Sequence, residues 1–158
     1  MGSFRNASGI GREAHRANPP PCNVDVVNLL LVDDDARLRR AVASMLERAG
    51  YSVQVAEHGG EALERLEAGD RFDLVLSDVD MPVLDGIGLA MHMGKAHLTT
   101  ALILMSGSDQ PRSQIAQIHQ NPPLLRKPLD LAELHHWCLI LGCRIPVSQD
   151  ARLTSMAS

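Results

Sequence analysis

Four short apolar runs in this sequence end in side chains that can do chemistry. In chain order, Asp33 and Asp34 follow residues 28–32, Asp78 follows 74–77, Ser106 follows 101–105 and Lys127 follows 124–126. Crowded carboxylates repel one another unless a cation is present, and a few carboxylates plus waters suit Mg²⁺. A carboxylate placed there could attack a phosphoryl group while the ammonium and the hydroxyl contact its oxygens. These residues therefore predict Mg²⁺-dependent phosphoryl chemistry at Asp78.

Amphipathic stretches alternate with the apolar runs and predict the helices that would position these side chains. Apolar residues recur at i, i+3 and i+4 between Asp35 and Gly50, which indicates a helix with Asp35 as its N-cap. Further helices are expected at about 60–68, from Gly86 through Met93, at 112–120 and at 131–141, and a further strand at 52–56. The segment 112–120 has few apolar anchors, so we expect it to be the weakest helix.

Five strands alternating with five helices predict an α/β fold, a doubly wound five-stranded parallel sheet with helices on both faces. The strand sequences are continuously apolar, as strands buried on both sides are. The carboxyl ends of parallel strands line one edge of a sheet. Asp33 and Lys127 would meet at that edge although about ninety residues separate them.

The chain of 158 residues has a formal charge of -4, and its basic residues are dispersed. It lacks the basic field of a nucleic-acid-binding protein, so no direct nucleic-acid partner is expected. No apolar stretch approaches the roughly 20 residues of a membrane span, and no secretory signal is present, which predicts a cytoplasmic protein without a membrane partner. Three cysteines without CxxC spacing indicate neither a disulfide framework nor a zinc site.

Composition divides the chain into three parts. Residues 1–25 include Pro19-Pro20-Pro21 and have no apolar periodicity, so they are expected to form a flexible N-terminal extension. Residues 26–141 hold every predicted strand and helix and form one domain. Residues 142–158 carry no pattern and are expected to be a C-terminal tail.

The domain resembles the receiver domain of two-component response regulators over about residues 28–141. The likeness rests on motifs that occur in the family's order and close to its spacing: Val32-Asp33-Asp34, Asp78 with Met81-Pro82 and Asp85-Gly86, Ser106-Gly107, and Lys127-Pro128. It implies a flavodoxin-like sheet of strand order 2-1-3-4-5 and a phospho-acceptor switch of a phosphorelay. Such a domain catalyses its own phosphorylation and dephosphorylation but turns over no external substrate.

The resemblance also implies a role for each site residue. Asp78 is the phosphoacceptor; Asp34, Asp78 and the backbone carbonyl of Asp80 bind Mg²⁺ directly; Asp33 binds it through water; Ser106 is the switch hydroxyl; and Lys127 senses the phosphoryl group. The implied partners are a sensor histidine kinase or a histidine phosphotransfer protein, a downstream protein target and, in a homodimer, a second copy of the chain. The protein would be a stand-alone regulator or the receiver of a hybrid histidine kinase.

Two features depart from the family pattern or have another explanation. Leu124 stands where receivers usually carry an aromatic switch residue, so a degenerate receiver that acts as a constitutive protein-binding scaffold is an alternative. Asp85-Gly86 is interpreted structurally, as a turn whose glycine adopts a positive φ.

A haloacid-dehalogenase-like phosphatase is the alternative from the enzyme class, because Asp78-Val79-Asp80 also fits its DxD motif. Pro82 departs from that family's pattern, and the chain has no room for its cap domain.

Overall fold

A five-stranded parallel sheet forms the centre of the structure, a computed structural model that describes residues 26–108 and 111–147. The strands are β1 (Val27–Val32), β2 (Tyr51–Ala56), β3 (Leu74–Asp78), β4 (Ala101–Ser106) and β5 (Leu124–Arg126). They lie in the order β2-β1-β3-β4-β5, and every neighbouring pair is parallel. The predicted fold class and flavodoxin-like strand order are therefore confirmed.

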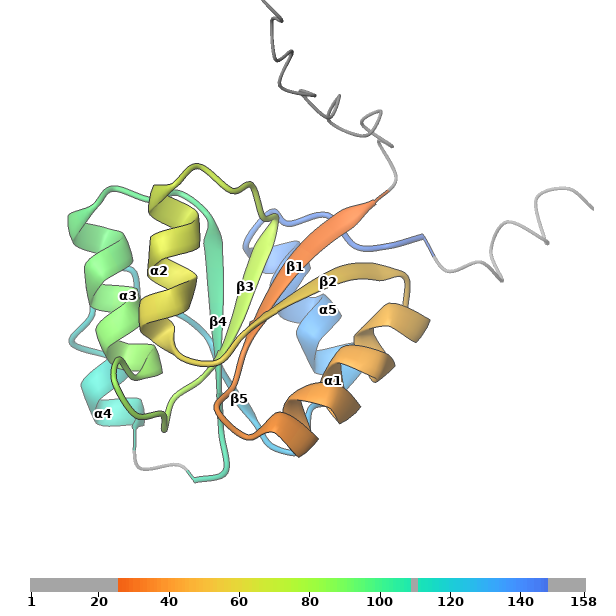
Figure 1. Cartoon of the computed structure of the whole chain (residues 1–158), viewed down its shortest axis with the longest axis horizontal. Coiled ribbons are helices and arrows are strands. Elements are labelled where there is room, and N and C mark those ends of the chain that lie inside the picture. The colour runs from red at the N-terminus through yellow and green to blue at the C-terminus, as the bar shows by residue number, and fades with distance from the viewer. Residues whose placement is uncertain (1–25, 109–110, 148–158) are drawn as a thin grey trace, which may run out of the picture.

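Helices cover both faces of the sheet (Figure 1). They are α1 (Ala36–Arg48), α2 (Gly59–Glu67), α3 (Gly86–Lys95), α4 (Arg112–Ile115) and α5 (Leu131–Ile140). Side chains of α1 and α5 pack with those of the strands in one apolar core, and side chains of α2, α3 and α4 pack in the other. All five residues of β3 are buried, because this strand lies at the centre of the sheet and is covered on both sides.

The first helix begins and ends where its sequence predicts. Asp35 is the N-cap of α1, and its Oδ1 accepts hydrogen bonds from the backbone N–H groups of Arg37 at 2.9 Å and Leu38 at 3.2 Å. These bonds satisfy two donors that the first helical turn leaves unpaired. Gly50 follows the helix with a φ of 100°, a conformation that glycine adopts without steric cost.

The helix predicted over residues 112–120 is wrong in its length. Only Arg112–Ile115 is helical, and the following residues form tighter turns in which Ile118 N–H donates to the Ile115 carbonyl at 2.9 Å. Pro111 precedes the helix and supplies no side-chain cap. Ile115 and Ile118 are buried, and two apolar anchors are too few to hold three regular turns against the sheet.

Residues after α5 pack against the sheet domain as far as they are described. Arg144 Nη2 lies 3.1 Å from Asp73 Oδ1 and donates to the Val26 carbonyl at 3.3 Å. Cys143 and Ile145 are partly buried against the core that α1 and α5 cover. The N-terminal extension predicted over residues 1–25 and the end of the tail at 148–158 lie outside the described residues. No described helix has the length and apolar character needed to cross a membrane.

Candidate functional site

The carboxyl ends of four strands bring the predicted site residues to one edge of the sheet, at the bottom of Figure 1. Asp33 directly follows β1, Asp78 and Ser106 are the last residues of β3 and β4, and Lys127 directly follows β5. The strands remain paired up to this edge, since Val79 N–H donates to the Met105 carbonyl and Lys127 N–H to the Ser106 carbonyl, both at 2.9 Å.

Three carboxylates meet at this edge. Oxygen atoms of Asp33, Asp34 and Asp78 lie within 4.8 Å of one another. Asp33 is 1% exposed and Asp78 is 7% exposed, whereas Asp34 is exposed to solvent. Hard cations such as Mg²⁺ prefer carboxylate oxygens, so the donor set fits such an ion.

Lys127 is the cation that the described residues place among these acids. Its Nζ lies 3.0 Å from Asp78 Oδ2 and 3.3 Å from Asp33 Oδ2. Burial by itself would lower the pKa of Lys127, but the hydrogen bonds and the charges of Asp78 and Asp33 outweigh it and raise the pKa. The ammonium is therefore held in its charged form between the two carboxylates.

The electrostatic environment of Asp78 differs from that of an ordinary aspartate. Burial raises its pKa, and the nearby charge of Asp33 acts in the same direction. The hydrogen bond and charge of Lys127, and a backbone hydrogen bond from Asp80, oppose that rise without cancelling it. Asp78 thus has incomplete charge compensation, which a bound cation would complete.

Asp80 and Ser106 lie at the same edge but outside the ion-pair cluster. Asp80 is exposed, and its backbone N–H lies 3.4 Å from Asp78 Oδ1. Ser106 is buried, and its Oγ accepts a hydrogen bond from Ser108 N–H at 3.1 Å. Among the described residues, the Ser106 hydroxyl makes no hydrogen bond with Asp78 or Lys127.

Gly86 is required for a reason other than the predicted one. It does not have a positive φ, so that interpretation is wrong. It is the first residue of α3, and a Cβ added there would lie 2.4 Å from the Asp78 carbonyl oxygen and 3.0 Å from Val79 Cα. Asp85 is the N-cap, and its Oδ1 accepts from Gly88 N–H at 2.6 Å. The glycine lets α3 begin in contact with the backbone of the carboxylate-bearing strand.

Arg39 also supports the site, and the sequence interpretation did not include it. Its Nη1 donates to the Asp33 carbonyl at 2.5 Å, and its Nη2 lies 3.3 Å from Glu57 Oε1. The contact holds the turn after β1 in place. Its one sequence signal is position, because Arg39 lies one helical turn after the N-cap Asp35.

Comparison with known proteins agrees with this geometry. The family model described as the response regulator receiver domain matches residues 29–138. The response regulator MprA of Mycolicibacterium vanbaalenii is 35% identical over 109 residues, which cover 68% of this chain and 47% of that protein. The sensor histidine kinase AruS of Pseudomonas aeruginosa is 33% identical over 145 residues, which cover 87% of this chain and 14% of the kinase. The chain spans about half the length of MprA and a small part of AruS.

Solved structures share the fold. TrrA from Thermotoga maritima, in complex with Mg²⁺-BeF, superposes with a TM-score of 0.64 and is 28% identical, with coverage of 73% of this chain and 98% of that chain. The chemotaxis protein CheY4 of Vibrio cholerae has a TM-score of 0.62 and 28% identity at the same coverage.

Proposed function

Because the chain belongs to the response regulator receiver domain family, we propose that Asp78 takes a phosphoryl group from a phosphohistidine donor. The observation that supports this role is the ion-pair cluster at the carboxyl edge of the sheet. It combines a nearly buried carboxylate, Asp78, with a cation, Lys127, 3.0 Å away and two further acids. This is the arrangement that phosphoryl transfer to a carboxylate requires.

Asp78 acts as the nucleophile. One of its carboxylate oxygens attacks phosphorus, and the P–N bond to the donor imidazole breaks. The imidazole takes the bonding electron pair and leaves as a neutral ring, because its other ring nitrogen carries a proton. The product is an acyl phosphate on Asp78. Lys127 already contacts this carboxylate, so its ammonium is positioned to neutralise charge on the transferred oxygens.

Magnesium is the proposed cofactor. Asp34, Asp78 and the backbone carbonyl of Asp80 would hold the ion directly, and Asp33 would hold it through water. Bound there, Mg²⁺ would offset negative charge on the phosphoryl oxygens. The donor chemistry of the three carboxylates supports this assignment, as does the Mg²⁺-BeF complex of the related TrrA.

Ser106 is the proposed switch residue. Its hydroxyl lies at the end of β4, next to β3, and bonds within its own turn to Ser108 N–H. A phosphoryl group on Asp78 would offer this hydroxyl a charged acceptor, which forms a stronger hydrogen bond than a neutral one. Donation to that acceptor would reorient the hydroxyl, move the turn at residues 106–108 and report the state of Asp78.

The proposed donor is a sensor histidine kinase or a histidine phosphotransfer protein in the cytoplasm, and the proposed recipient of the signal is a downstream protein or a second copy of the chain. Residues 26–141 form the receiver, and residues 1–25 and 142–158 flank it. The match to AruS favours the receiver of a hybrid kinase as one setting, and the match to MprA favours a response regulator as the other.

The constitutive scaffold remains the second candidate, and Leu124 favours it. The phosphatase alternative loses its support, because the receiver family model covers residues 29–138, including Asp78, Ser106 and Lys127. A scaffold needs no assembled acid cluster with a bridging lysine, which is why we prefer the phospho-acceptor.

Chemical lability of the modification tests the proposal. After incubation with phosphoramidate and Mg²⁺, the native chain and Ser106→Ala should both carry a phosphoryl group that hydroxylamine removes, as it removes an acyl phosphate. A modification that resists hydroxylamine and disappears in Ser106→Ala would assign the phosphoryl group to the serine and contradict the proposal.

A further inference from the structure

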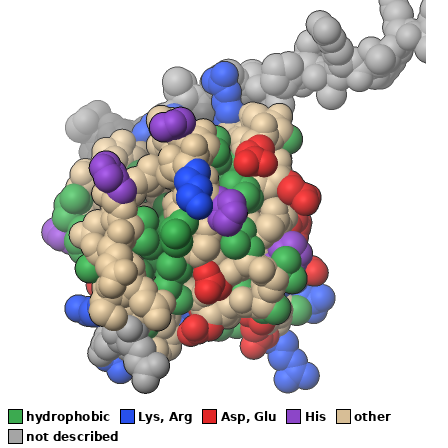
Figure 2. Space-filling model, turned by 90° about the vertical axis from the view of Figure 1, so that its left-hand side faces the viewer, with side chains coloured by type: hydrophobic (Ala, Val, Ile, Leu, Met, Phe, Trp, Pro, Cys, Tyr) green, Lys and Arg blue, Asp and Glu red, His purple; other side chains and the backbone are tan. Residues whose placement is uncertain are grey.

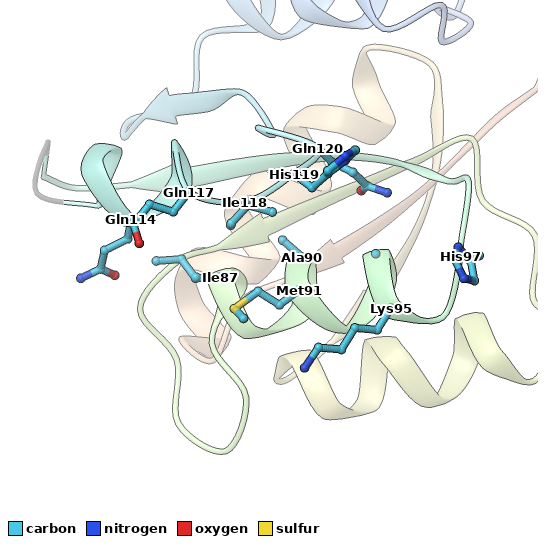
Figure 3. Close-up of a pocket in the computed structure, with 11 residues that line it drawn as sticks. Ile87, Ala90, Met91, Lys95, His97, Gln114, Gln117, Ile118, His119 and Gln120 are labelled. Carbon is cyan, nitrogen blue, oxygen red and sulfur yellow. The ribbon is translucent and has the colours of Figure 1, made fainter.

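A groove of about 800 Å³ separates α3 from the segment that follows α4. Figure 3 shows side chains of α3, among them Ile87, Ala90 and Met91, on one side and side chains of residues 114–120 on the other. The volume falls within the roughly 300–1,000 Å³ of ligand-binding clefts. The groove contains none of the carboxylates, the serine or the lysine of the phosphorylation site.

The groove has an apolar floor and an exposed apolar wall. Ala90 and Ile118 are buried and form part of the floor, while Ile87 is partly buried. Met91 is 48% exposed although it lies in the middle of α3. The space-filling view in Figure 2 shows apolar side chains gathered in a strip on this face. Methionine adapts its shape to different apolar partners, so Met91 suits a contact surface.

The charge around the groove differs in sign from that of the chain. The whole chain has 19 Asp and Glu against 15 Lys and Arg, yet Lys95 is the charged side chain among the described residues that line the groove, which also include His97 and His119 and no carboxylate. Within residues 26–108 and 111–147, no carboxylate pairs with Lys95. Gln114, Gln117 and Gln120 add amide groups that can bond a peptide backbone. The lining therefore complements an acidic partner.

The short α4 helix shapes this groove. Because regular helix ends at Ile115, the far wall consists of turns that carry Gln117, Ile118 and His119. The apolar floor and the basic rim thus come from two separate segments of the chain. A cylinder-shaped ligand could lie between them.

We propose that the groove between α3 and residues 114–120 is a docking site for a helical peptide segment of a partner protein that carries aliphatic side chains flanked by Asp or Glu. The aliphatic side chains fill the space over Ala90 and Ile118, and the acidic side chains face Lys95, as in other complexes in which a helix binds in a groove. Docking there does not depend on phosphoryl transfer. Asp78→Asn therefore binds the same peptides, which separates this proposal from the proposed function.

Gly94 provides a direct way to block the groove. It lines the groove, and a Cβ added there meets no atom within 4 Å, so a larger side chain can be placed without a clash at its Cβ. Gly94→Trp fills the space that a partner's side chain would use. Gly94→Ala is the matched control, because it also replaces the glycine with a residue of higher helix propensity and leaves the groove open.

The test is a selection of phage-displayed random dodecapeptides on the full native chain, with counter-selection on Gly94→Trp. The selected peptides should be rich in aliphatic residues and in Asp or Glu. Their dissociation constants, from fluorescence anisotropy, should be about tenfold higher for Gly94→Trp and unchanged for Gly94→Ala. Lys95→Glu should weaken binding about tenfold through like-charge repulsion, while Arg40→Glu on the opposite face of the sheet should not. Circular dichroism melting shows whether Gly94→Trp folds. If it does not fold, the binding of Lys95→Glu decides the test.

Four results would overturn the docking site: no enrichment over the counter-selected library, enrichment of basic or uncharged peptides, equal binding to Gly94→Trp and the native chain, or equal binding to Lys95→Glu. A concentration-dependent dimer that Gly94→Trp abolishes would also overturn it, because the occupant would then be a second copy of the chain.

Discussion

The Nζ atom of Lys127 lies 3.0 Å from Oδ2 of Asp78, and it reaches Asp33 as well, at 3.3 Å. One ammonium therefore faces three carboxylates, since Asp34 completes the cluster. When all four groups are ionised, two negative charges remain without a counter-charge. This excess of negative charge favours the binding of a divalent cation at the site. The stability of the domain should therefore depend on that cation.

Mg²⁺ should stabilise the folded chain by binding to these carboxylates. At a concentration ten times the dissociation constant, the gain is about 1.4 kcal/mol of unfolding free energy. Differential scanning fluorimetry should show a higher melting temperature in millimolar Mg²⁺, and Asp34→Ala should abolish the increase. Glu67→Ala removes an exposed carboxylate of α2 and should retain it. A melting temperature that does not change when Mg²⁺ is added would contradict the metal assignment.

Lys127→Met should destabilise the domain by about 3 kcal/mol, because it leaves two nearly buried carboxylates without their cation. Mg²⁺ should recover part of this loss, so its effect on the melting temperature should be larger in the variant than in the native chain. Lys95→Met, a change to the chain's other lysine, should alter neither stability nor the response to Mg²⁺. Equal Mg²⁺ responses in Lys127→Met and the native chain would show that the lysine and the ion do not share these carboxylates.

The pH dependence of the unfolding free energy should show that the folded chain disfavours the charged form of Asp78. Its pKa is raised in the folded state, mainly by burial, so the folded chain binds this proton more tightly than the unfolded chain. Stability from this group is therefore present at low pH and is lost as the pH rises from about 4 through the raised pKa. Asp78→Asn should consequently be more stable than the native chain at pH 7, and the difference should shrink toward pH 4. Urea unfolding at several pH values measures it, and a difference that grows toward pH 4 would be the wrong sign.

Lys127 has a pH dependence of the same sign as Asp78, but in a higher pH range. Asp78 and Asp33 raise its pKa in the folded state against the effect of burial, so its stabilising contribution is complete at neutral pH and is lost only as the pH rises through that raised pKa. The contribution of Lys127 therefore stays constant between about pH 4 and 7, where that of Asp78 changes.

The sheet and the acid cluster were predictable because each depends on a short-range pattern repeated several times. Apolar runs of three to five residues ended in Asp33, Asp78, Ser106 and Lys127, and parallel topology alone brings such ends together. The length of α4 and the role of Gly86 were not predictable in this way. The end of α4 depends on how many apolar side chains reach the sheet, and Gly86 is needed because of one contact with the Asp78 carbonyl oxygen, to which sequence periodicity gives no clue. Arg39 was missed because its contact is with a backbone carbonyl.

Activation should change hydrogen exchange more in residues 112–120 than in β5. The α4 helix has one turn and few apolar anchors, so its segment opens at low cost, and Leu124 has no polar group that could exchange partners with Ser106. Exchange measured with and without an acyl-phosphate mimic should show the largest change in 112–120, and none in Asp78→Asn. Leu124→Tyr should shift part of the response to β5. Protection changes confined to residues 124–126 would mean that the signal takes another route.

Intact mass spectrometry after incubation with phosphoramidate and Mg²⁺ tests the role of Asp78 most directly. The native chain should gain the mass of one phosphoryl group, Asp78→Asn should gain none, and Asp70→Asn, which changes an exposed aspartate after α2, should behave as the native chain does. Without Mg²⁺ the native chain should react much more slowly. A phosphoryl group that appears equally on Asp78→Asn, or a native chain that gains none, would contradict the phospho-acceptor function.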